Sequence, residues 1–285
     1  MVGRSPACFL LLDVEYASKE HAVIQWTEGR WSLKDLGSRN GTFLEGRRVE
    51  PGILHRLIPG QRIAFGRAED PWILEDDRPP EALALNLSSR RIRESAGGLI
   101  ALPDDDSPEV VVLQRPDGYW TMESADGDDA RTVQDRQTVS VGDESWCLLL
   151  PEPQEATPLL PTSLGIESVI FRFGVSQDEE RVTLTLVAPH RSVPVQAREF
   201  NYVLLTLARA RLADRDQPLP ERGWIDRESL LRMLRMRPTA LNVAIHRARQ
   251  QLHAAGLVGA AGIVEVRRRA RRFGSDRIEV GPLTD

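Results

Sequence analysis

The sequence predicts a multidomain chain with an all-β sandwich first, a second β-rich region next and an α+β module at the C-terminal end. The chain has 285 residues, 41% of them apolar, which is enough for two or three separate cores. Strand-like runs broken by Gly, Pro and Asn fill the first half, whereas apolar residues recur three and four positions apart after residue 198. A Pro-rich segment, "PEPQEATPLLPTS", separates the two patterns.

Residues 1–78 contain the short apolar runs "CFLLL", "HAVIQW", "WSLKDL" and "RIAFG", which is typical of a β-sandwich. Residues 84–152 contain "EVVVLQ", "YWTME" and "SWCLLL" and predict the second β-rich region. We expect the acidic stretches "PDDDSP" and "ADGDD" between these runs to be solvated loops. A shift of 89 residues aligns segment 20–35 with segment 109–124. The second region is therefore either a degenerate repeat of the first or an unrelated hairpin with a similar turn.

A linker is expected at 153–165, and the α+β module at 166–280. "SVIFRFGV" and "RVTLTLV" predict two strands, and "AREFNYVLLTLARARL" predicts a first helix. "DRESLLRML" predicts a second helix that begins after Asp226, a good N-cap. "PTALNVAIHRARQQLHAAG" predicts a third helix that ends at Gly256. "IVEVRRR" and "DRIEV" predict a terminal hairpin around the basic turn "ARRFGS".

The charge is divided unevenly along the chain. Residues 1–197 carry 20 basic and 32 acidic side chains, a net charge of −12, whereas residues 198–285 carry 17 and 10, a net charge of +7. This asymmetry indicates that the basic part meets a polyanion.

Several classes of function are disfavoured by what the sequence lacks. It has no run of 18 apolar residues and no basic leader before an apolar run, so we expect a cytoplasmic protein without membrane contact. Cys8 and Cys147 do not have the spacing of a zinc or disulfide framework, and His246 and His253 lack acidic or Cys partners, so no metal is expected. We find no P-loop, nucleophile elbow or kinase signature, so we expect neither an enzyme nor a cofactor.

Four motifs in the first region occur in a common order and spacing: "VGRS", "SKEH", "GSRNGT" and "LIPGQRIAFG". In these motifs residues 1–78 resemble a forkhead-associated domain. The resemblance implies a sandwich whose loops bind a phosphothreonine peptide in preference to a phosphoserine peptide. Such a phosphate carries close to two negative charges and accepts charge-assisted hydrogen bonds. The resemblance implies phosphopeptide contacts by Arg4, Ser18, Arg39 and Asn40, and structural roles for Gly3, His21 and Gly41.

In that family's pattern Arg4 and Ser18 hold the phosphate, and the amide of Asn40 bonds the peptide main chain. His21 braces the loop that bears Ser18, and Arg39 is either a second cation or a solvated loop charge. The family's sandwich has strands before its Gly-Arg pair, whereas this sequence begins two residues before it. We therefore expect either a start further upstream or first strands that are missing or replaced. The 89-residue shift pairs Arg4 with Arg93 and Ser18 with Ser107 but leaves Gly3, His21 and Asn40 without counterparts.

The order of elements in the last region resembles the winged helix of OmpR-like and PhoB-like response regulators, with the third helix as recognition helix. If Leu241, Ile245, Ala248 and Leu252 face the core, the opposite face points outward and fits the major groove, while the basic turn suits phosphates or the minor groove. The expected DNA contacts are Asn242, His246, Arg247, Arg249, Gln250, Arg267, Arg268, Arg269, Arg271 and Arg272. The alternative is a solvated basic face that docks another protein.

Together these features predict a bacterial transcriptional regulator in Ser/Thr kinase signalling. Its partners would be a phosphothreonine-containing kinase or kinase substrate, double-stranded DNA and, if binding causes dimerisation, a second copy of the chain. The alternative function is a phosphothreonine-dependent adaptor whose winged helix contacts protein. Residues 84–152 are open to three interpretations: a degenerate second sandwich, a dimerisation surface or an autoinhibitory cover.

Overall fold

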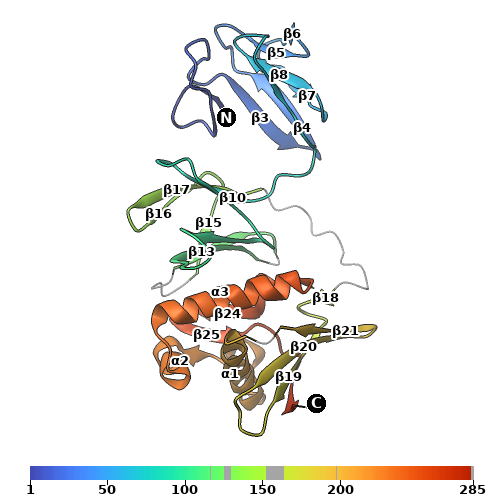
Figure 1. Cartoon of the computed structure of the whole chain (residues 1–285), viewed down its shortest axis with the longest axis vertical. Helices are drawn as coiled ribbons and strands as arrows, with labels where there is room; N and C mark the ends of the chain where they lie inside the picture. The colour runs from blue at the N-terminus through green and yellow to red at the C-terminus, as the bar shows by residue number, and fades with distance from the viewer. Residues whose placement is uncertain (116, 125–129, 152–163, 197, 284–285) are drawn as a thin grey trace. The chain divides into compact units, whose positions relative to one another are not determined.

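The computed structural model describes residues 1–115, 117–124, 130–151, 164–196 and 198–283. These residues form two compact units, Met1–Pro80 and Glu81–Asp285, and each is described by itself (Figure 1). The acidic stretch at 125–129 and nearly all of the predicted linker at 153–165 lie outside the described residues. In the described part of the chain no helix combines the length and apolar character needed to cross a membrane.

The first unit consists of two β-sheets around a small apolar core. The strand order is β2-β1-β3-β4-β7 in one sheet and β6-β5-β8-β9 in the other. The strands are β1 (Val2–Gly3), β2 (Leu10–Leu11), β3 (Ala22–Thr27), β4 (Arg30–Asp35), β5 (Thr42–Leu44), β6 (Arg47–Arg48), β7 (His55–Arg56), β8 (Arg62–Phe65) and β9 (Pro71–Ile73). A two-residue turn joins β3 to β4, and both turn residues, Glu28 and Gly29, have positive φ as a tight hairpin requires.

The second β-rich region is also a sandwich, and it belongs to the second unit. Its sheets have the orders β11-β10-β17-β16 and β12-β13-β14-β15. The strands are β10 (Leu83–Asn86), β11 (Ile92–Glu94), β12 (Leu99–Leu102), β13 (Val110–Gln114), β14 (Trp120–Ser124), β15 (Arg131–Val133), β16 (Thr138–Val141) and β17 (Glu144–Leu149). Fourteen buried side chains, among them Trp120 and Trp146, form its core. We refer to residues 81–150 as the second sandwich.

The repeat suggested by the sequence agrees only in part with the strand positions. The β3–β4 hairpin and the β13–β14 hairpin occupy corresponding segments. Arg93, however, lies in β11, which pairs with β10 in the opposite sheet, whereas Arg4 follows β1, which pairs with β3. The pairing of Arg4 with Arg93 is therefore wrong, because the two arginines occupy different sheets of their sandwiches.

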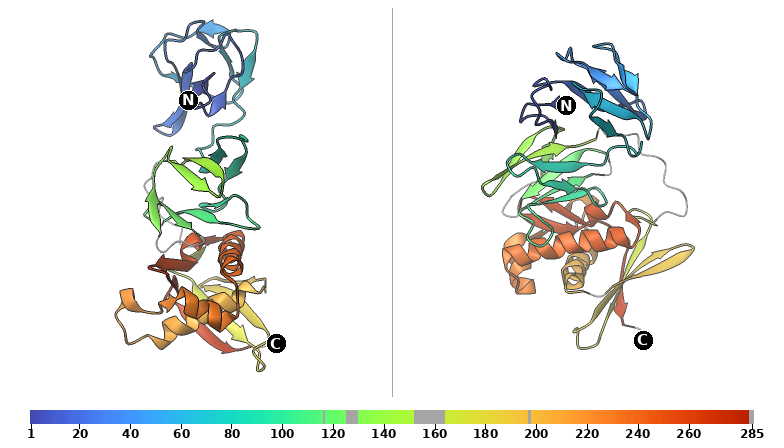
Figure 2. Two further views of the ribbon diagram at one scale, coloured as in Figure 1. Left: turned by 90° about the vertical axis from the view of Figure 1, so that its left-hand side faces the viewer. Right: turned by 45° about the horizontal axis from the view of Figure 1, so that its top comes forward.

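The C-terminal part of the second unit has a four-stranded sheet, β21-β20-β19-β26, and three helices (Figure 1, Figure 2). The helix α1 packs against α3, the strand β25 and the strand β20. The elements are β18 (Leu164–Gly165), β19 (Ile170–Val175), β20 (Val182–Ala188), β21 (Arg191–Val195), α1 (Phe200–Ala213), η1 (Leu219–Glu221), β22 (Ile225–Asp226), α2 (Arg227–Leu234), α3 (Pro238–Ala254), β23 (Leu257–Val258), η2 (Ala260–Ile263), β24 (Val264–Arg267), β25 (Ala270–Phe273) and β26 (Ile278–Pro282).

The predicted helix boundaries agree with these elements. The Asp226 side chain accepts hydrogen bonds from the backbone N–H groups of Glu228 and Ser229, as an N-cap does. The helix α3 ends two residues before Gly256, whose φ of 87° reverses the chain.

The terminal hairpin differs from the prediction. The segment expected as its basic turn forms the strand β25, which pairs with β24, and the real turn is Arg268–Arg269. The run "DRIEV" contributes β26, which pairs in parallel with β19 instead of closing the hairpin. Alternation along β25 explains the difference, because it buries Arg271 and Phe273 on one face.

Candidate functional site

Three loops of the first unit are hydrogen-bonded to one another at one end of the β3–β4 hairpin. The backbone N–H of Arg4 donates to the carbonyl of Ser18 at 2.9 Å, which joins the first loop to the second. The backbone N–H of Arg39 donates to the Ser18 hydroxyl oxygen at 3.1 Å, which joins the third loop to the second. Ser18 therefore stands between the two arginines that the sequence singles out.

These groups offer positive charge and a hydroxyl to a ligand. Arg4 and Arg39 are exposed, and among the described residues neither forms an ion pair with a carboxylate. The Nε of Arg4 donates to the carbonyl of Ala17 at 3.3 Å, which holds the guanidinium beside the Ser18 loop. The Ser18 hydroxyl accepts from Arg39 and keeps its hydrogen to donate. Such a set of donors can bind an anion through charge-assisted hydrogen bonds.

His21 is buried beneath these loops and holds them together by hydrogen bonds. Its buried ring accepts a hydrogen bond from the Ser18 N–H at Nδ1, at 3.0 Å, so Nε2 carries the proton and donates to the carbonyl of Gly41 at 3.1 Å. Burial lowers the pKa of His21 from its ordinary value of 6.5, although the bond to Gly41 acts in the opposite direction. The neutral ring thus connects the Ser18 loop to the 37–42 loop, as the resemblance implied.

Two glycines allow the loops to approach each other. A Cβ on Gly3 would lie 2.3 Å from the carbonyl oxygen of Lys19, and one on Gly41 would lie 2.3 Å from the Nε of Arg48. Gly41 also has a φ of 89°, which favours glycine. The Lys19 backbone therefore restricts position 3 to hydrogen, and the backbone angle favours glycine at position 41.

Asn40 has an internal partner besides the peptide contact that the resemblance implies. Its side-chain amide donates to the carbonyl of Tyr16 at 2.8 Å, so this N–H ties the 37–42 loop to the Ser18 loop. The expectation gave that amide to the main chain of a bound peptide. One N–H of the amide thus shapes the site, and the contact of Asn40 with a bound peptide stays a prediction.

Sequence reasoning missed Asp35, which organises the 37–42 loop. Its buried carboxylate accepts from the hydroxyls of Ser38 and Thr42, both at 2.6 Å, and from the backbone N–H groups of Gly37 and Ser38. Burial alone raises the pKa of Asp35, but these hydrogen bonds outweigh it and lower the pKa. An Asp with Gly and Ser two and three positions after it is an Asx-turn signal, and it could have identified this residue.

The helix α3 presents a second candidate site. Its apolar stripe lies in the core as predicted, since Leu241, Ile245, Ala248 and Leu252 are buried. The opposite face was expected to point into solvent, and for most of its length this is wrong. His246 and Arg249 are each only 1% exposed, because the second sandwich covers them.

Acidic side chains of the second sandwich hold this face of α3. The guanidinium of Arg249 donates to both carboxylate oxygens of Glu123 in β14, at 2.8 and 3.1 Å. One carboxylate oxygen of Asp105 lies 2.9 Å from the Nε2 of His246 and accepts from the Gln250 amide at 2.9 Å. Every polar side chain that the sequence placed on the DNA-facing side in this half of α3 therefore has a partner in the second sandwich.

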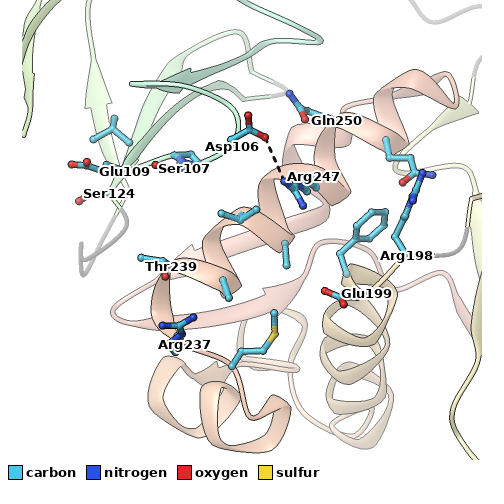
Figure 3. A pocket seen from close by; sticks show the side chains of 18 of the residues that line it. Asp106, Ser107, Glu109, Ser124, Arg198, Glu199, Arg237, Thr239, Arg247 and Gln250 are labelled. Atoms are coloured by element: carbon cyan, nitrogen blue, oxygen red, sulfur yellow. Dashed lines mark hydrogen bonds and ion pairs between the residues drawn. The ribbon is translucent and has the colours of Figure 1, made fainter.

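The stretch "PDDDSP" is solvent-exposed at Asp106, as expected, but it also contacts α3, which the sequence did not indicate. Asp105 is oriented from its other side by an ion pair with Arg93, and Asp106 lies 3.5 Å from the exposed Arg247 (Figure 3). Burial raises the pKa of Asp105, but its hydrogen bonds to His246 and Arg93 outweigh burial, so the net direction is downward. The loop therefore presents negative charge to α3.

The arginines of the terminal hairpin lie in three environments. Arg267, Arg268 and Arg269 are exposed at the turn. Arg267 pairs with Glu221, Arg272 pairs with Glu265, and both guanidinium groups lie over the Trp224 ring, at 4.6 and 4.5 Å from its centroid. Arg271 is 2% exposed, so it is not available as the surface contact that the sequence suggested. Asn242 is half-buried on α3, beside the small cavity that His246 and Arg249 also line.

A cavity of 1480 Å³ lies between the second sandwich and one side of α3, along the helix from Thr239 to Ala254 (Figure 3). Its lining includes Glu109, Arg198, Arg237, Thr239 and Arg247. The hydrogen bonds and ion pairs described above come from His246, Arg247, Arg249 and Gln250, on the C-terminal half of the helix.

Comparison with known proteins identifies a family for part of the chain. Residues 1–66 match the family described as the FHA domain. The chain is 36% identical to nibrin of Danio rerio over 77 residues, which are 27% of this chain and 9% of nibrin. It is 35% identical to mediator of DNA damage checkpoint protein 1 of Mus musculus over 118 residues, 38% of this chain and 7% of that protein.

A bacterial relative is also similar to part of the chain. FHA domain-containing protein FhaB of Mycobacterium tuberculosis (strain ATCC 25618 / H37Rv) is 36% identical over 67 residues, which are 24% of this chain and 42% of FhaB. The chain thus spans less than half of the length of each of these relatives.

Proposed function

We propose that this protein, which carries an FHA domain over residues 1–66, binds a phosphothreonine peptide through the loops that bear Arg4, Ser18 and Arg39. The observation that carries the proposal is the position of Ser18. Its carbonyl accepts from the backbone of Arg4 and its hydroxyl accepts from the backbone of Arg39, so one hydroxyl and two guanidinium groups lie together at the end of a rigid sandwich. A phosphate dianion matches this set in charge and in its number of acceptors.

The internal network supports binding without large rearrangement. His21, Asn40 and Asp35 fix the three loops by hydrogen bonds before any ligand arrives. A site whose groups are held in place loses little conformational entropy on binding. Arg4 would neutralise the phosphate, Ser18 would donate a hydrogen bond to it, and Arg39 would add a second positive charge.

The test is fluorescence anisotropy of a random phosphothreonine peptide library with the wild type and with Arg4→Ala. Binding should require the phosphate and should fall at least about tenfold in Arg4→Ala, because a charge-assisted pair is removed. Arg30→Ala is the matched control, since Arg30 is an exposed arginine beyond the β3–β4 turn, at the other end of the hairpin. Equal loss in both variants, or equal binding of the unphosphorylated library, would remove the proposal.

For the C-terminal part, the function that we favour is DNA binding, which would make the protein a phosphothreonine-responsive transcriptional regulator. The arrangement of α2, α3 and the β24–β25 hairpin supports it, because a helix followed by a basic hairpin is the layout of a winged helix. Three exposed arginines, Arg267, Arg268 and Arg269, at the hairpin turn supply a phosphate contact. Phosphopeptide binding would then recruit, release or dimerise this module.

The alternative is an adaptor whose C-terminal part contacts protein. The burial of Arg249 and His246 favours it, since these side chains already have partners within the chain. Binding of a random-sequence DNA duplex at several salt concentrations distinguishes the two functions. A steep fall of affinity with salt indicates that phosphates are contacted, whereas absence of duplex binding even at low salt favours the adaptor.

A further inference from the structure

The contact between the second sandwich and α3 joins an acidic part of the chain to a basic part. Residues 81–150 contain 14 acidic and 6 basic side chains, a net charge of −8. The C-terminal part that they meet has a net charge of +7 over residues 198–285. The carboxylates of Glu123 and Asp105 therefore occupy the position that a polyanion would seek.

The positive charges of three arginines from separate elements interact with one another and with the carboxylate of Glu123. Arg249 lies in α3, Arg271 in β25 and Arg227 at the start of α2. Burial lowers the pKa of Arg271, as do the charges of Arg227 and Arg249, whereas the charge of Glu123 raises it. Glu123 thus neutralises positive charge that α2, α3 and the hairpin bring together, much as a phosphate would.

An apolar contact beside these ion pairs makes the arrangement specific. The strand β13 reads Val-Val-Val-Leu, and both of its faces are buried. Val110 and Val112 lie in the core of the second sandwich, whereas Val111 and Leu113, with Leu99, pack against Ala261 of η2. A sandwich strand needs only one apolar face, so the second face indicates a permanent or frequent partner.

The contact is also separable. The second sandwich and the C-terminal part have separate apolar cores, and the shared apolar cluster contains only four residues. The 1480 Å³ cavity separates the two surfaces along one side of α3, from Thr239 to Ala254. Contacts of this kind between parts of a chain can open while each part stays folded.

From these observations we infer that the second sandwich competes with nucleic acid for the polar face of α3 within the same chain. Glu123 and Asp105 hold the side chains of α3 that would contact DNA, and the chain binds DNA through α3 only when the second sandwich has left this helix. The inference rests on the proposed DNA-binding function of the C-terminal part and assigns its regulation to residues 81–150. Any signal that separates the two surfaces increases DNA binding.

The test uses the full chain and two pairs of neutralising substitutions. Asp105→Asn with Glu123→Gln removes the two charges at α3 and keeps the shapes of the side chains. Asp117→Asn with Asp143→Asn removes two charges from exposed loops of the same sandwich and is the matched control. Each variant is measured by hydrogen exchange of α3 and by anisotropy of a random-sequence DNA duplex.

We expect exchange in the C-terminal half of α3 to become faster in the first pair, and duplex affinity to rise by about tenfold, a typical coupling between two sites. Both readouts should stay at the wild-type value in the control pair. Slow exchange in β10 and β17 would verify that the second sandwich remains folded. Val111→Gln opens the apolar side of the contact and should give the same result by an independent route.

Two outcomes overturn the inference directly. One is unchanged exchange of α3 in both opening variants, and the other is faster exchange with unchanged duplex affinity in chains that do bind DNA. If α3 opens and no form of the chain binds the duplex at all, the proposed DNA-binding function has failed, and the inference fails with it. The exchange data separate this case from the others because they report opening without reference to DNA.

Discussion

Glu123 and Arg249 are 126 residues apart in the chain and form a two-pronged ion pair from which solvent is nearly excluded, with side-chain exposures of 14% and 1%. Arg249 also donates to the carbonyl of Val264 at 2.7 Å, so the guanidinium connects α3, β14 and β24. A buried pair of this kind contributes little net stability, but removing one partner leaves the other charge buried alone.

We therefore predict that Glu123→Met destabilises the second unit by about 3–5 kcal/mol, whereas Glu123→Met combined with Arg249→Met destabilises it by less. Chemical denaturation of the three chains, followed by hydrogen exchange in α3 and β14, measures the coupling. The Val264 carbonyl loses its partner in the double variant, so the recovery is expected to be partial. Equal destabilisation by the single and the double variant would contradict the prediction.

Ser18→Ala should also weaken phosphothreonine binding by at least about tenfold, as Arg4→Ala does. The substitution removes one hydrogen bond to the phosphate, worth about 1.5–3 kcal/mol for a charged acceptor, and frees the Arg39 N–H from its acceptor. Calorimetric titration with a peptide selected from the library measures the loss of affinity. Ser32→Ala, at a buried serine in β4, controls for the loss of any hydroxyl in the first unit.

Gly3→Ala should loosen the site through the backbone. The new Cβ would lie 2.3 Å from the Lys19 carbonyl, so the Ser18 loop must move, at a cost of about 1–3 kcal/mol. Gly29→Ala is the control, because Gly29 has a φ of 72° and no atom within 4 Å of the added Cβ, and it carries only conformational strain of about 1 kcal/mol. Phosphopeptide affinity should fall in Gly3→Ala alone, and a matching loss in Gly29→Ala would exclude this explanation.

The stability of the first unit should fall below pH 6.5 because of His21. Its pKa is lowered in the folded state, mainly by burial, so the unfolded chain binds the proton more readily. The contribution of the neutral ring is complete above pH 6.5 and is lost as the pH falls toward the folded pKa. Asp35 affects stability at lower pH. Because its pKa is lowered in the folded state, its contribution to stability is complete above pH 3.8 and is lost as the pH falls below that value.

Hydrogen exchange of β3 and β4 between pH 7 and 5, corrected for the intrinsic rate, measures this dependence. An NMR titration that placed the pKa of His21 at or above 6.5 would contradict the prediction.

Arg268→Ala with Arg269→Ala should weaken duplex binding about equally for all sequences and reduce its salt dependence by about one unit of slope for each phosphate that the variant no longer neutralises. Both residues are exposed at the hairpin turn. Arg172→Ala, which removes an exposed arginine that pairs with Glu279 on the outer sheet, is the control. The measurement is best made in the Asp105→Asn, Glu123→Gln background, where α3 should be open.

Local patterns alone predicted much of this protein. The four motifs of the first unit identified its loops, Asp226 marked the start of α2, and the stripe through Leu241 and Leu252 fixed the buried side of α3. These features depend on residues within a few positions of one another, since caps, turns and amphipathic periodicity are local. The sequence therefore determined where most of the elements lie and the apolar face that each presents to its own core, but it misplaced the turn of the terminal hairpin.

The tertiary structure decided which partners cover the remaining faces. The pattern of α3 predicts that Arg249 lies opposite its apolar stripe, but only the packing of β14 places Glu123 there. Similarly, the all-apolar run of β13 indicated a strand without indicating that its second face meets Ala261. The physical reason is that a charged or apolar face determines which kind of side chain can pack against it. Which residue does so depends on how the chain folds back over more than a hundred residues.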